Sequence, residues 1–369
     1  MNQLFRWDQT GLFLLALAAG ILPFAVPEVC SAALREGLTL CSGPLLLSLF
    51  PFLVVSRLLI QCPESDLLAL PFRLAAWGIG IRTPCAARVL CIGFLGGFAP
   101  AASAAAQAVR TGQLTAEEAD ALLPACICSG PSFVVLTVGQ SLLGSAELGV
   151  LLFASQITAN YLTAALLNRF AGVRSVKPGS AAPASPAPPR LDEILADAAI
   201  TYCKLCGFIL FFRMLAAGAG ALLPAGAGTL CAILLEVCSG CDLASRTGRW
   251  GSLLCCAALS VQGLSVLLQV RTICPPEMTL RPLYQARILH LPLSLALFYL
   301  LLPGGEADVF STLPARVLLM RRVPPDCALL VFAVCCMAAC ALRSGIRQVE
   351  QKQMARNAGG CCINSKTLL

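Results

Sequence analysis

The residues of this sequence that could do chemistry are few, and most of them lie inside apolar stretches. Glu236 follows a long run without a charge. An ionisable group at membrane depth is costly, so we expect it to face a cavity or a charged partner. The candidate partners are Arg213 and the pair Arg287 and His290, which share one helix face at i, i+3. Glu236 is therefore interpreted as part of an ion or proton path, with a structural ion pair as the alternative.

A polar stripe and a lone histidine complete the candidate groups. Gln262, Ser265 and Gln269 follow at i, i+3 and i+7, which places them on one face of an apolar helix. Such a stripe either bonds neighbouring helices or lines a cavity. His290 is the only histidine, so catalytic systems with a second histidine are excluded and a packing role is favoured. Without a Walker loop, dinucleotide fingerprint, HExxH or nucleophile elbow, we predict no catalytic residue, cofactor or metal ion, and no enzyme.

The cysteines are interpreted as reduced thiols. There are 21 of them, most in apolar segments where a thiol packs as a small apolar side chain. Cys203 with Cys206 and Cys238 with Cys241 form two CxxC pairs, each able to converge on a metal from a helix. However, 31 residues separate the pairs, against about 15 to 20 in zinc ribbons. Helix packing is the preferred interpretation.

Two stretches break the rules for a helix at membrane depth. Residues 93–103 (GFLGGFAPAAS) and 126–133 (CICSGPSF) combine glycine, proline and small polar residues. Broken helices of this kind form the binding sites of carriers, whereas the alternative is close helix packing through small residues. We expect a small solute to bind where these stretches meet Glu236 and the polar stripe. The predicted solute-binding residues are Gly96, Gly97, Phe98, Pro100, Ser103, Ser129, Gly130, Ser132, Glu236, Ser239, Gln262, Ser265 and Gln269.

Composition places these residues in a membrane protein. The chain has 369 residues, of which 58% are hydrophobic and 12% charged, whereas soluble domains carry about 25% charged residues. The mean hydropathy is +0.81. The net charge of +7 is dispersed over short connections, which argues against a nucleic-acid partner and favours the lipid surface. We predict an all-α, multi-pass transmembrane bundle in the cell membrane.

About ten apolar segments have the length of a membrane crossing. Residues 67–82, with two arginines and a tryptophan, are instead predicted to lie at the interface. Three basic regions cannot all be placed on one side by counting crossings, so at least one segment is expected to be re-entrant. Thr115 and Glu118 predict a capping box at a helix start. The predicted crossings are 11–26, 38–60, 85–109, 121–143, 148–167, 194–217, 226–244, 250–273, 283–302 and 327–342.

The chain divides at a segment rich in proline, alanine and serine, 172–190, which is typical of a linker. Short matches keep their order on both sides of it: 52–59 with 208–215, 90–91 with 230–231, and 130–135 with 263–268. These matches favour two related halves, a common construction of carriers. The predicted divisions are an N-terminal transmembrane helix (1–27), a first half (28–171), the linker (172–193), a second half (194–302), a loop with the last transmembrane helix (303–342) and a basic polar tail (343–369).

Six short stretches also follow one another in the order of a known family. They are 96–102 (GGFAPAA), 112–119 (GQLTAEEA), 129–133 (SGPSF), 235–240 (LEVCSG), 263–266 with Gln269, and 287–290 (RILH). From about residue 38 to 302 the chain resembles the sporulation integral membrane proteins of endospore-forming bacteria, which carry the nucleoside-recognition Gate domain. The resemblance implies a polytopic membrane protein that acts in spore formation.

The chain departs from that family at its candidate site. Where the family reads Ser-Gly-Tyr-Pro-x-Gly-Ala-Lys, residues 96–103 lack the tyrosine and the lysine, and the proline is displaced by one position. Where the family has Asn before Ser-Gly-Pro, this chain has 126–128, Cys-Ile-Cys. These losses favour a less polar solute than a nucleoside, or a degenerate site.

Together these observations predict a transporter-like sporulation protein whose partners are membrane lipid and a small solute. A homo-oligomer and other sporulation membrane proteins are further candidate partners. The alternative is a non-transporting scaffold for assembly of the spore envelope, which would dock through the linker or the tail.

Overall fold

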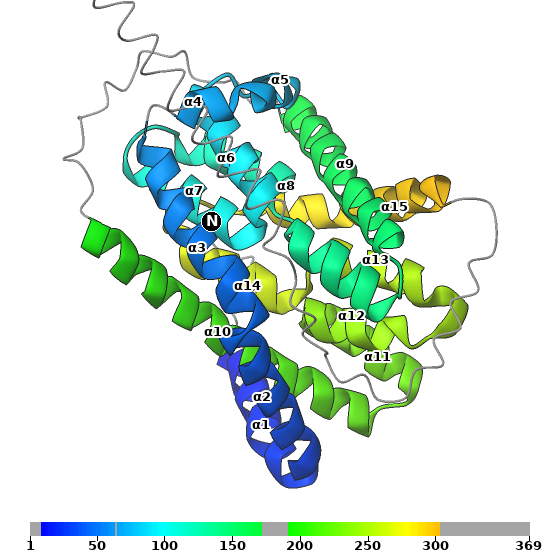
Figure 1. Ribbon diagram of the computed structural model, residues 1–369. Coiled ribbons are helices and arrows are strands. Elements are labelled where there is room, and N and C mark those ends of the chain that lie inside the picture. Colours follow the sequence, from blue (N-terminus) through cyan, green and yellow to red (C-terminus); the bar gives the residue numbers. More distant parts are fainter. Residues whose placement is uncertain (1–8, 63–64, 172–190, 303–369) are drawn as a thin grey trace, which may run out of the picture.

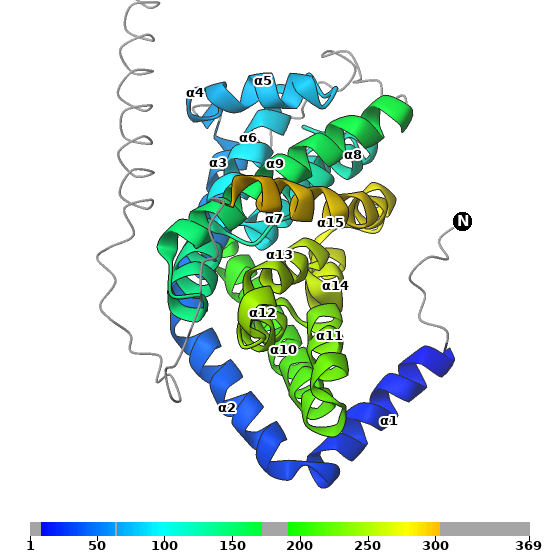
Figure 2. The ribbon, with the colours of Figure 1, turned by 90° about the vertical axis from the view of Figure 1, so that its right-hand side faces the viewer.

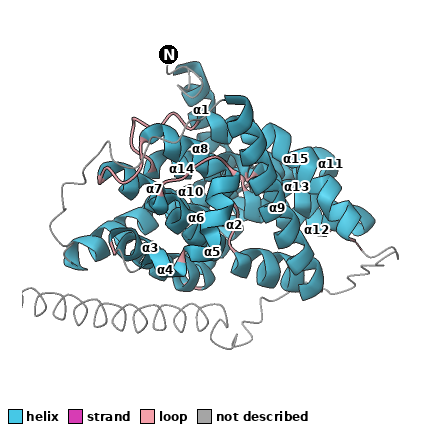
Figure 3. Ribbon diagram, turned by 90° about the horizontal axis from the view of Figure 1, so that it is seen from above, coloured by secondary structure: helices cyan, strands magenta, loops and turns pink. Residues whose placement is uncertain are grey.

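The structure, a computed structural model, describes residues 9–62, 65–171 and 191–302, and within these ranges the chain is helical without any strand (Figure 1; Figure 3). This confirms the all-helical prediction. In the described part of the chain, three segments are long and apolar enough to cross a membrane: Ala146–Ala171, Leu191–Leu222 and Gly248–Ile273. These segments indicate a membrane protein. The predicted span 327–342, the tail 343–369 and the linker residues 172–190 lie outside the described residues.

The N-terminal helices are bent where proline begins each new helix. Helix α1 (Gln9–Ala25) meets α2 (Pro27–Ser42) at an angle of 108°, which Figure 2 shows as a sharp turn at one end of the molecule. Helix α3 (Pro44–Gln61) follows after Gly43. Proline suits the first turn of a helix because it has no amide hydrogen to donate there. The predicted crossing 38–60 is therefore divided between α2 and α3.

Two short helices occupy the region predicted to lie at the interface. They are α4 (Ser65–Leu68) and α5 (Leu70–Gly78). Helix α5 buries Ala76, whereas Leu74 and Trp77 are exposed by 72% and 57%. An exposed leucine and tryptophan beside a buried face fit a helix that lies along a lipid surface.

Two of the predicted single crossings are hairpins of two helices. In the first, α6 (Pro84–Gly96) packs against α7 (Phe98–Arg110), and the turn between them is Gly97 with φ +81°. In the second, α11 (Ala225–Leu235) packs against α12 (Val237–Ser245), and the turn is Glu236. The crossings predicted at 85–109 and 226–244 are thus wrong as single helices, because the chain leaves the helical conformation at Gly97 and at Glu236.

Two further predicted crossings are broken helices. Helix α8 (Ala116–Cys126) begins at the predicted capping box and is followed, after 127–131, by the π-helix η1 (Ser132–Leu142). After the 3₁₀ turn η2 (Gly248–Trp250), α13 (Gly251–Val261) is followed by α14 (Gly263–Ile273). The break there is Gln262, whose φ of +66° is left-handed. The capping box is confirmed: the Glu118 amide donates to Thr115 Oγ1 at 3.1 Å, and the Thr115 amide donates to Glu118 Oε2 at 3.2 Å.

Three long helices frame the broken ones. Helix α9 (Ala146–Ala171) packs against η1, α8 and α15 (Arg281–Leu301). Helix α10 (Leu191–Leu222) packs against α2, α3 and α11, and runs along one side of the molecule in Figure 1. The breaks of α6–α7, α8–η1, α11–α12 and α13–α14 are therefore enclosed between long helices.

Candidate functional site

The breaks of the first hairpin and the first broken helix are in backbone contact. A Cβ at Gly97 would lie 2.7 Å from the Gly130 nitrogen and 3.0 Å from its Cα. At position 97 only glycine combines a positive φ with this close approach. The two stretches predicted to break the helix rules are thus brought together.

The second hairpin and the second broken helix meet in the same way. Gly263 has φ +68°, and a Cβ there would lie 3.0 Å from the Glu236 nitrogen. The two pairs of breaks are also joined, because Gln262 Nε2 donates to Ser129 Oγ at 3.4 Å. All four breaks therefore meet in one region of the protein.

A cavity of about 70 Å³ lies among these breaks. One water molecule needs about 10 to 15 Å³ by this measure, so the cavity has room for several waters. Its walls include three phenyl rings, of Phe52, Phe98 and Phe133, and its polar groups come from the breaks and from α14. The predicted site residues that line it are Gly96, Phe98, Ser129, Gly130, Ser132, Glu236 and Gln269.

Glu236 is buried, with 2% exposure, and caps the helix that follows it. Its Oε1 accepts from the Cys238 amide at 2.8 Å, and its Oε2 accepts from the Ser239 amide at 2.7 Å. A carboxylate there also meets the positive end of the α12 dipole. Ser239 thus joins the site through its amide. None of the three predicted partners bonds to Glu236; Arg213 instead pairs with Glu36 at 2.7 Å.

Arg287 bonds to oxygens that the breaks leave free. Its Nη2 donates to the Ile127 carbonyl at 3.0 Å and to Asn160 Oδ1 at 3.2 Å, and its Nη1 donates to the Ser260 carbonyl at 3.3 Å. Arg287 is buried. Its role is to compensate the carbonyl ends of α8 and α13, where the helix dipoles are negative. His290, on the same face, contacts the Gln156 carbonyl at 3.2 Å, consistent with the predicted packing role.

Only some of the polar atoms in the predicted stripe have hydrogen-bond partners. Gln269 Nε2 donates to Ser265 Oγ at 2.9 Å, and Gln262 Nε2 donates to the Leu259 carbonyl at 2.6 Å. The Oε1 atoms of Gln262 and Gln269 are buried and have no hydrogen-bond partner among the described residues. A buried amide oxygen without a partner costs about 1 to 3 kcal/mol. Gln269 also lines the cavity, so this unpartnered oxygen belongs to a side chain that a bound molecule would meet.

Six predicted site residues do not line the cavity: Gly97, Pro100, Ser103, Ser239, Gln262 and Ser265. A Cβ at Gly96 would lie 2.9 Å from Pro100, whose ring packs behind the hairpin turn. The Ser103 hydroxyl accepts from Arg57 Nε at 3.3 Å and lines a different pocket. The helical register explains this, because Ser103 lies more than one turn beyond the break at Gly97.

Sequence reasoning missed the polar face of α9, where Gln156 and Asn160 bond the breaks. Gln156 Nε2 donates to the Cys256 carbonyl at 3.3 Å and to Ser260 Oγ at 3.0 Å, and Asn160 Nδ2 donates to the Ile127 carbonyl at 3.2 Å. The signal was present, because Gln156, Asn160 and Thr163 follow at i, i+4 and i+7 within an apolar segment. A similar helical spacing, i, i+3 and i+7, drew attention to the stripe of Gln262, Ser265 and Gln269.

Comparison of the chain with protein-family models, with curated proteins and with solved structures found no match. The arrangement itself offers a small cavity with an acid, two serine hydroxyls and a glutamine oxygen against phenyl rings. Such a site can bind a small molecule that donates hydrogen bonds or carries a positive charge.

Proposed function

We propose that this chain is a transporter-like integral membrane protein of spore formation, which binds a small solute at the cavity between the four breaks and moves it across the cell membrane. The observation that carries the proposal is the Gln269 oxygen, buried without a partner at the wall of a cavity that also contains Glu236. Most buried polar groups are hydrogen-bonded, and at Gln269 the unpartnered oxygen belongs to a side chain of the cavity wall.

The depth of the breaks supports transport rather than surface binding. Gln262 lies near the middle of Gly248–Ile273, a segment long enough to cross a bilayer. If that segment spans the membrane, the break and the cavity lie near the midplane, where carriers with discontinuous helices bind their solutes. The resemblance to sporulation membrane proteins supports the biological setting.

Two related halves, 28–171 and 194–302, are part of this proposal. A helical hairpin, a broken helix and a long helix follow one another as α6–α7, α8–η1 and α9, and again as α11–α12, α13–α14 and α15. The short sequence matches fall on corresponding elements: 90–91 and 230–231 on α6 and α11, and 130–135 and 263–268 around the second break of each half. This order supports a duplication.

The test is thermal stabilisation of the purified full-length protein by candidate solutes. A ligand that binds only the folded state must raise the melting temperature. We expect one class among nucleosides, amino acids, divalent cations and lipid precursors to do so for the wild type, and Glu236→Gln to remove the effect. Glu147→Gln is the matched control, because Glu147 is an exposed acid in the first turn of α9.

Uptake into sealed vesicles separates the carrier from the scaffold. A carrier accumulates the stabilising solute in the vesicles and keeps its function when residues 356–369 are deleted. A scaffold that docks through its tail accumulates no solute and loses its function with that deletion. The proposal fails if no solute class stabilises the wild type, or if Glu236→Gln leaves both stabilisation and uptake unchanged.

A further inference from the structure

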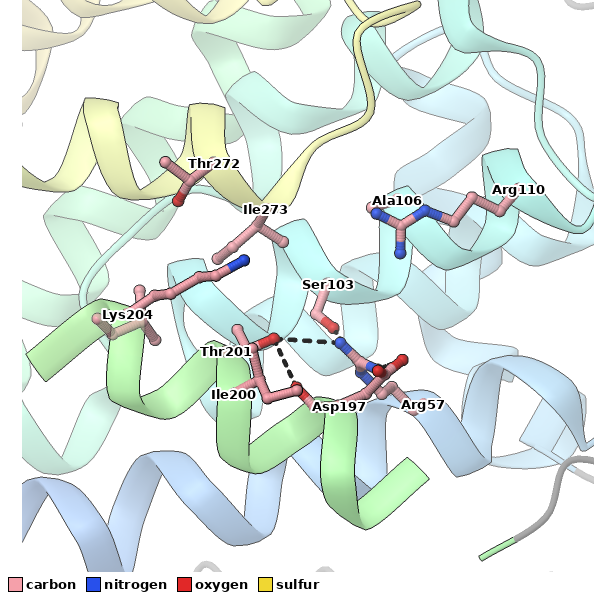
Figure 4. Close-up of a pocket in the computed structure, with 11 residues that line it drawn as sticks. Arg57, Ser103, Ala106, Arg110, Asp197, Ile200, Thr201, Lys204, Thr272 and Ile273 are labelled. Carbon is pink, nitrogen blue, oxygen red and sulfur yellow. Dashed lines mark hydrogen bonds and ion pairs between the residues drawn. The ribbon is translucent and has the colours of Figure 1, made fainter. Parts of the chain in front are cut away.

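A second pocket, of about 150 Å³, lies between α3, α7, α10 and α14 and shares no lining residue with the central cavity (Figure 4). Its walls carry three basic side chains, those of Arg57, Arg110 and Lys204, and one acid, Asp197. Hydroxyls come from three of the four helices: Ser103, Thr201 and Thr272. The pocket therefore has an excess of two positive charges and a set of neutral donors.

Arg57 is held rigidly at the base of this pocket. Its Nη1 lies 2.6 Å from Asp197 Oδ2, its Nη2 donates to Thr201 Oγ1 at 3.2 Å, and its Nε donates to Ser103 Oγ at 3.3 Å. The side chain is 9% exposed, whereas that of Asp197 is 63% exposed. Asp197 balances the charge of Arg57, so the excess positive charge belongs to the other two basic residues.

Arg110 and Lys204 have no hydrogen-bond or ion-pair partner among the described residues, although both line the pocket. In Figure 4 their charged groups extend from opposite sides, one from the end of α7 and the other from α10, toward the space above Arg57. Two like charges brought to one small pocket repel each other. An anion between them removes that repulsion and gives each a charge-assisted hydrogen bond.

The hydropathy of α10 indicates the depth of this pocket. After Lys204 the helix continues for 18 residues to Leu222, with Arg213 as the only charged residue. At about 1.5 Å per residue this stretch covers about 27 Å, close to the hydrocarbon thickness of a bilayer. Lys204 therefore marks one end of the apolar part of α10. Arg110 is the last residue of α7, and Thr272 lies in the last turn of α14.

We propose that this pocket binds a phosphate group. A phosphate offers several oxygens to the forked guanidinium of Arg110, the ammonium of Lys204 and the hydroxyls of Thr201 and Thr272. Phosphates are concentrated at the depth where the apolar part of α10 ends, as the headgroups of anionic phospholipids. The same chemistry would hold inorganic phosphate from solution, so the test has one arm for each source.

The experiment compares the melting temperature of the full-length protein in three conditions. They are nanodiscs of phosphatidylcholine alone, nanodiscs containing phosphatidylglycerol, and phosphatidylcholine nanodiscs with sodium phosphate against sodium chloride of equal ionic strength. The variants are Arg110→Gln/Lys204→Gln and a control that removes two distant positive charges, Arg35→Gln/Arg249→Gln. All four residues are exposed, so each substitution should leave folding intact.

We expect phosphatidylglycerol to raise the melting temperature of the wild type and of the control, and not that of Arg110→Gln/Lys204→Gln. Each positive charge near the surface contributes about fivefold to binding, so the double variant should bind about 25-fold more weakly. A soluble ligand is indicated if sodium phosphate alone gives this pattern. The proposal is overturned if neither phosphate source stabilises the wild type, or if both double variants lose the stabilisation equally. Arg110→Lys/Lys204→Arg, which keeps both charges, should retain it.

Discussion

Glu236 and Arg287 carry opposite charges, and each contacts the kind of helix end whose partial charge opposes its own. Glu236 accepts two amides at the start of α12, whereas Arg287 donates to the Ile127 and Ser260 carbonyls where α8 and α13 end. A broken helix exposes unpaired backbone groups that a membrane cannot satisfy. The two side chains supply the missing bonds, so breaks that would otherwise be unstable are retained around the cavity.

Removal of Arg287 should therefore destabilise the protein. Arg287→Gln shortens the side chain and leaves the Ser260 carbonyl without its donor, so we expect the free energy of unfolding to fall by about 2 to 4 kcal/mol. The control is Arg281→Gln, at the start of the same helix and partly exposed, which should change stability by less than about 0.5 kcal/mol. Melting temperatures in one detergent measure both. Equal melting temperatures for the two variants would contradict the role given to Arg287.

The contact between Gly97 and Gly130 predicts a position where alanine is not tolerated. Gly97→Ala places alanine at φ +81° and ψ −164°, a conformation essentially restricted to glycine, at about 1 to 3 kcal/mol. It also adds a clash with backbone atoms at 2.7 and 3.0 Å, which cannot move aside as a side chain would. Gly112→Ala is the matched control, because Gly112 has φ +69° and a Cβ there meets nothing within 4 Å.

We expect Gly112→Ala to show the cost of a positive φ in open space, and Gly97→Ala to lose at least about 2 kcal/mol more, because overpacking adds to its less favourable backbone conformation. Thermal unfolding of the two purified variants measures the difference. If they melt together, the hairpin turn is not packed against the first broken helix.

The sequence allowed the chemistry of the breaks to be predicted better than their geometry. Glycine, proline and serine at 96–103 and 126–133 predict an interrupted helix independently of the residues packed around them. Seven of the predicted site residues do line the cavity. Whether an interruption bends the chain back on itself depends on the neighbours of each half-helix. For this reason 85–109 and 226–244 were predicted as single crossings although both are hairpins.

The partners of charged groups were the least predictable part. Spacing along α15 places Arg287 and His290 on one face, but it does not reveal that this face looks toward α9 and the ends of α8 and α13. The amides that bond Glu236 belong to its own next turn, and backbone donors leave no trace in side-chain spacing. Long-range pairing such as Arg213 with Glu36, on α10 and α2, likewise depends on how the helices pack.

Substitution of Gln269 tests whether the residue serves a binding cavity or a packing contact. Gln269→Leu removes the buried oxygen that has no partner and, at similar volume, fills the same space. The stability of the empty protein should change by no more than about 1 kcal/mol, because removal of an unpaired buried acceptor offsets the lost bond to Ser265. The apparent affinity for the solute, measured from its stabilising effect, should fall at least tenfold.

The control for this substitution is Gln107→Leu on α7, a partly buried glutamine outside the cavity whose side chain makes no hydrogen bond among the described residues. It should leave the response to solute unchanged. Thermal unfolding with and without the stabilising solute measures both effects. A packing role for Gln269 predicts instead that the response to the solute stays intact. The response to the solute therefore separates the two interpretations, because Gln269→Leu removes both the unpaired oxygen and the bond to Ser265 from the empty protein in either case.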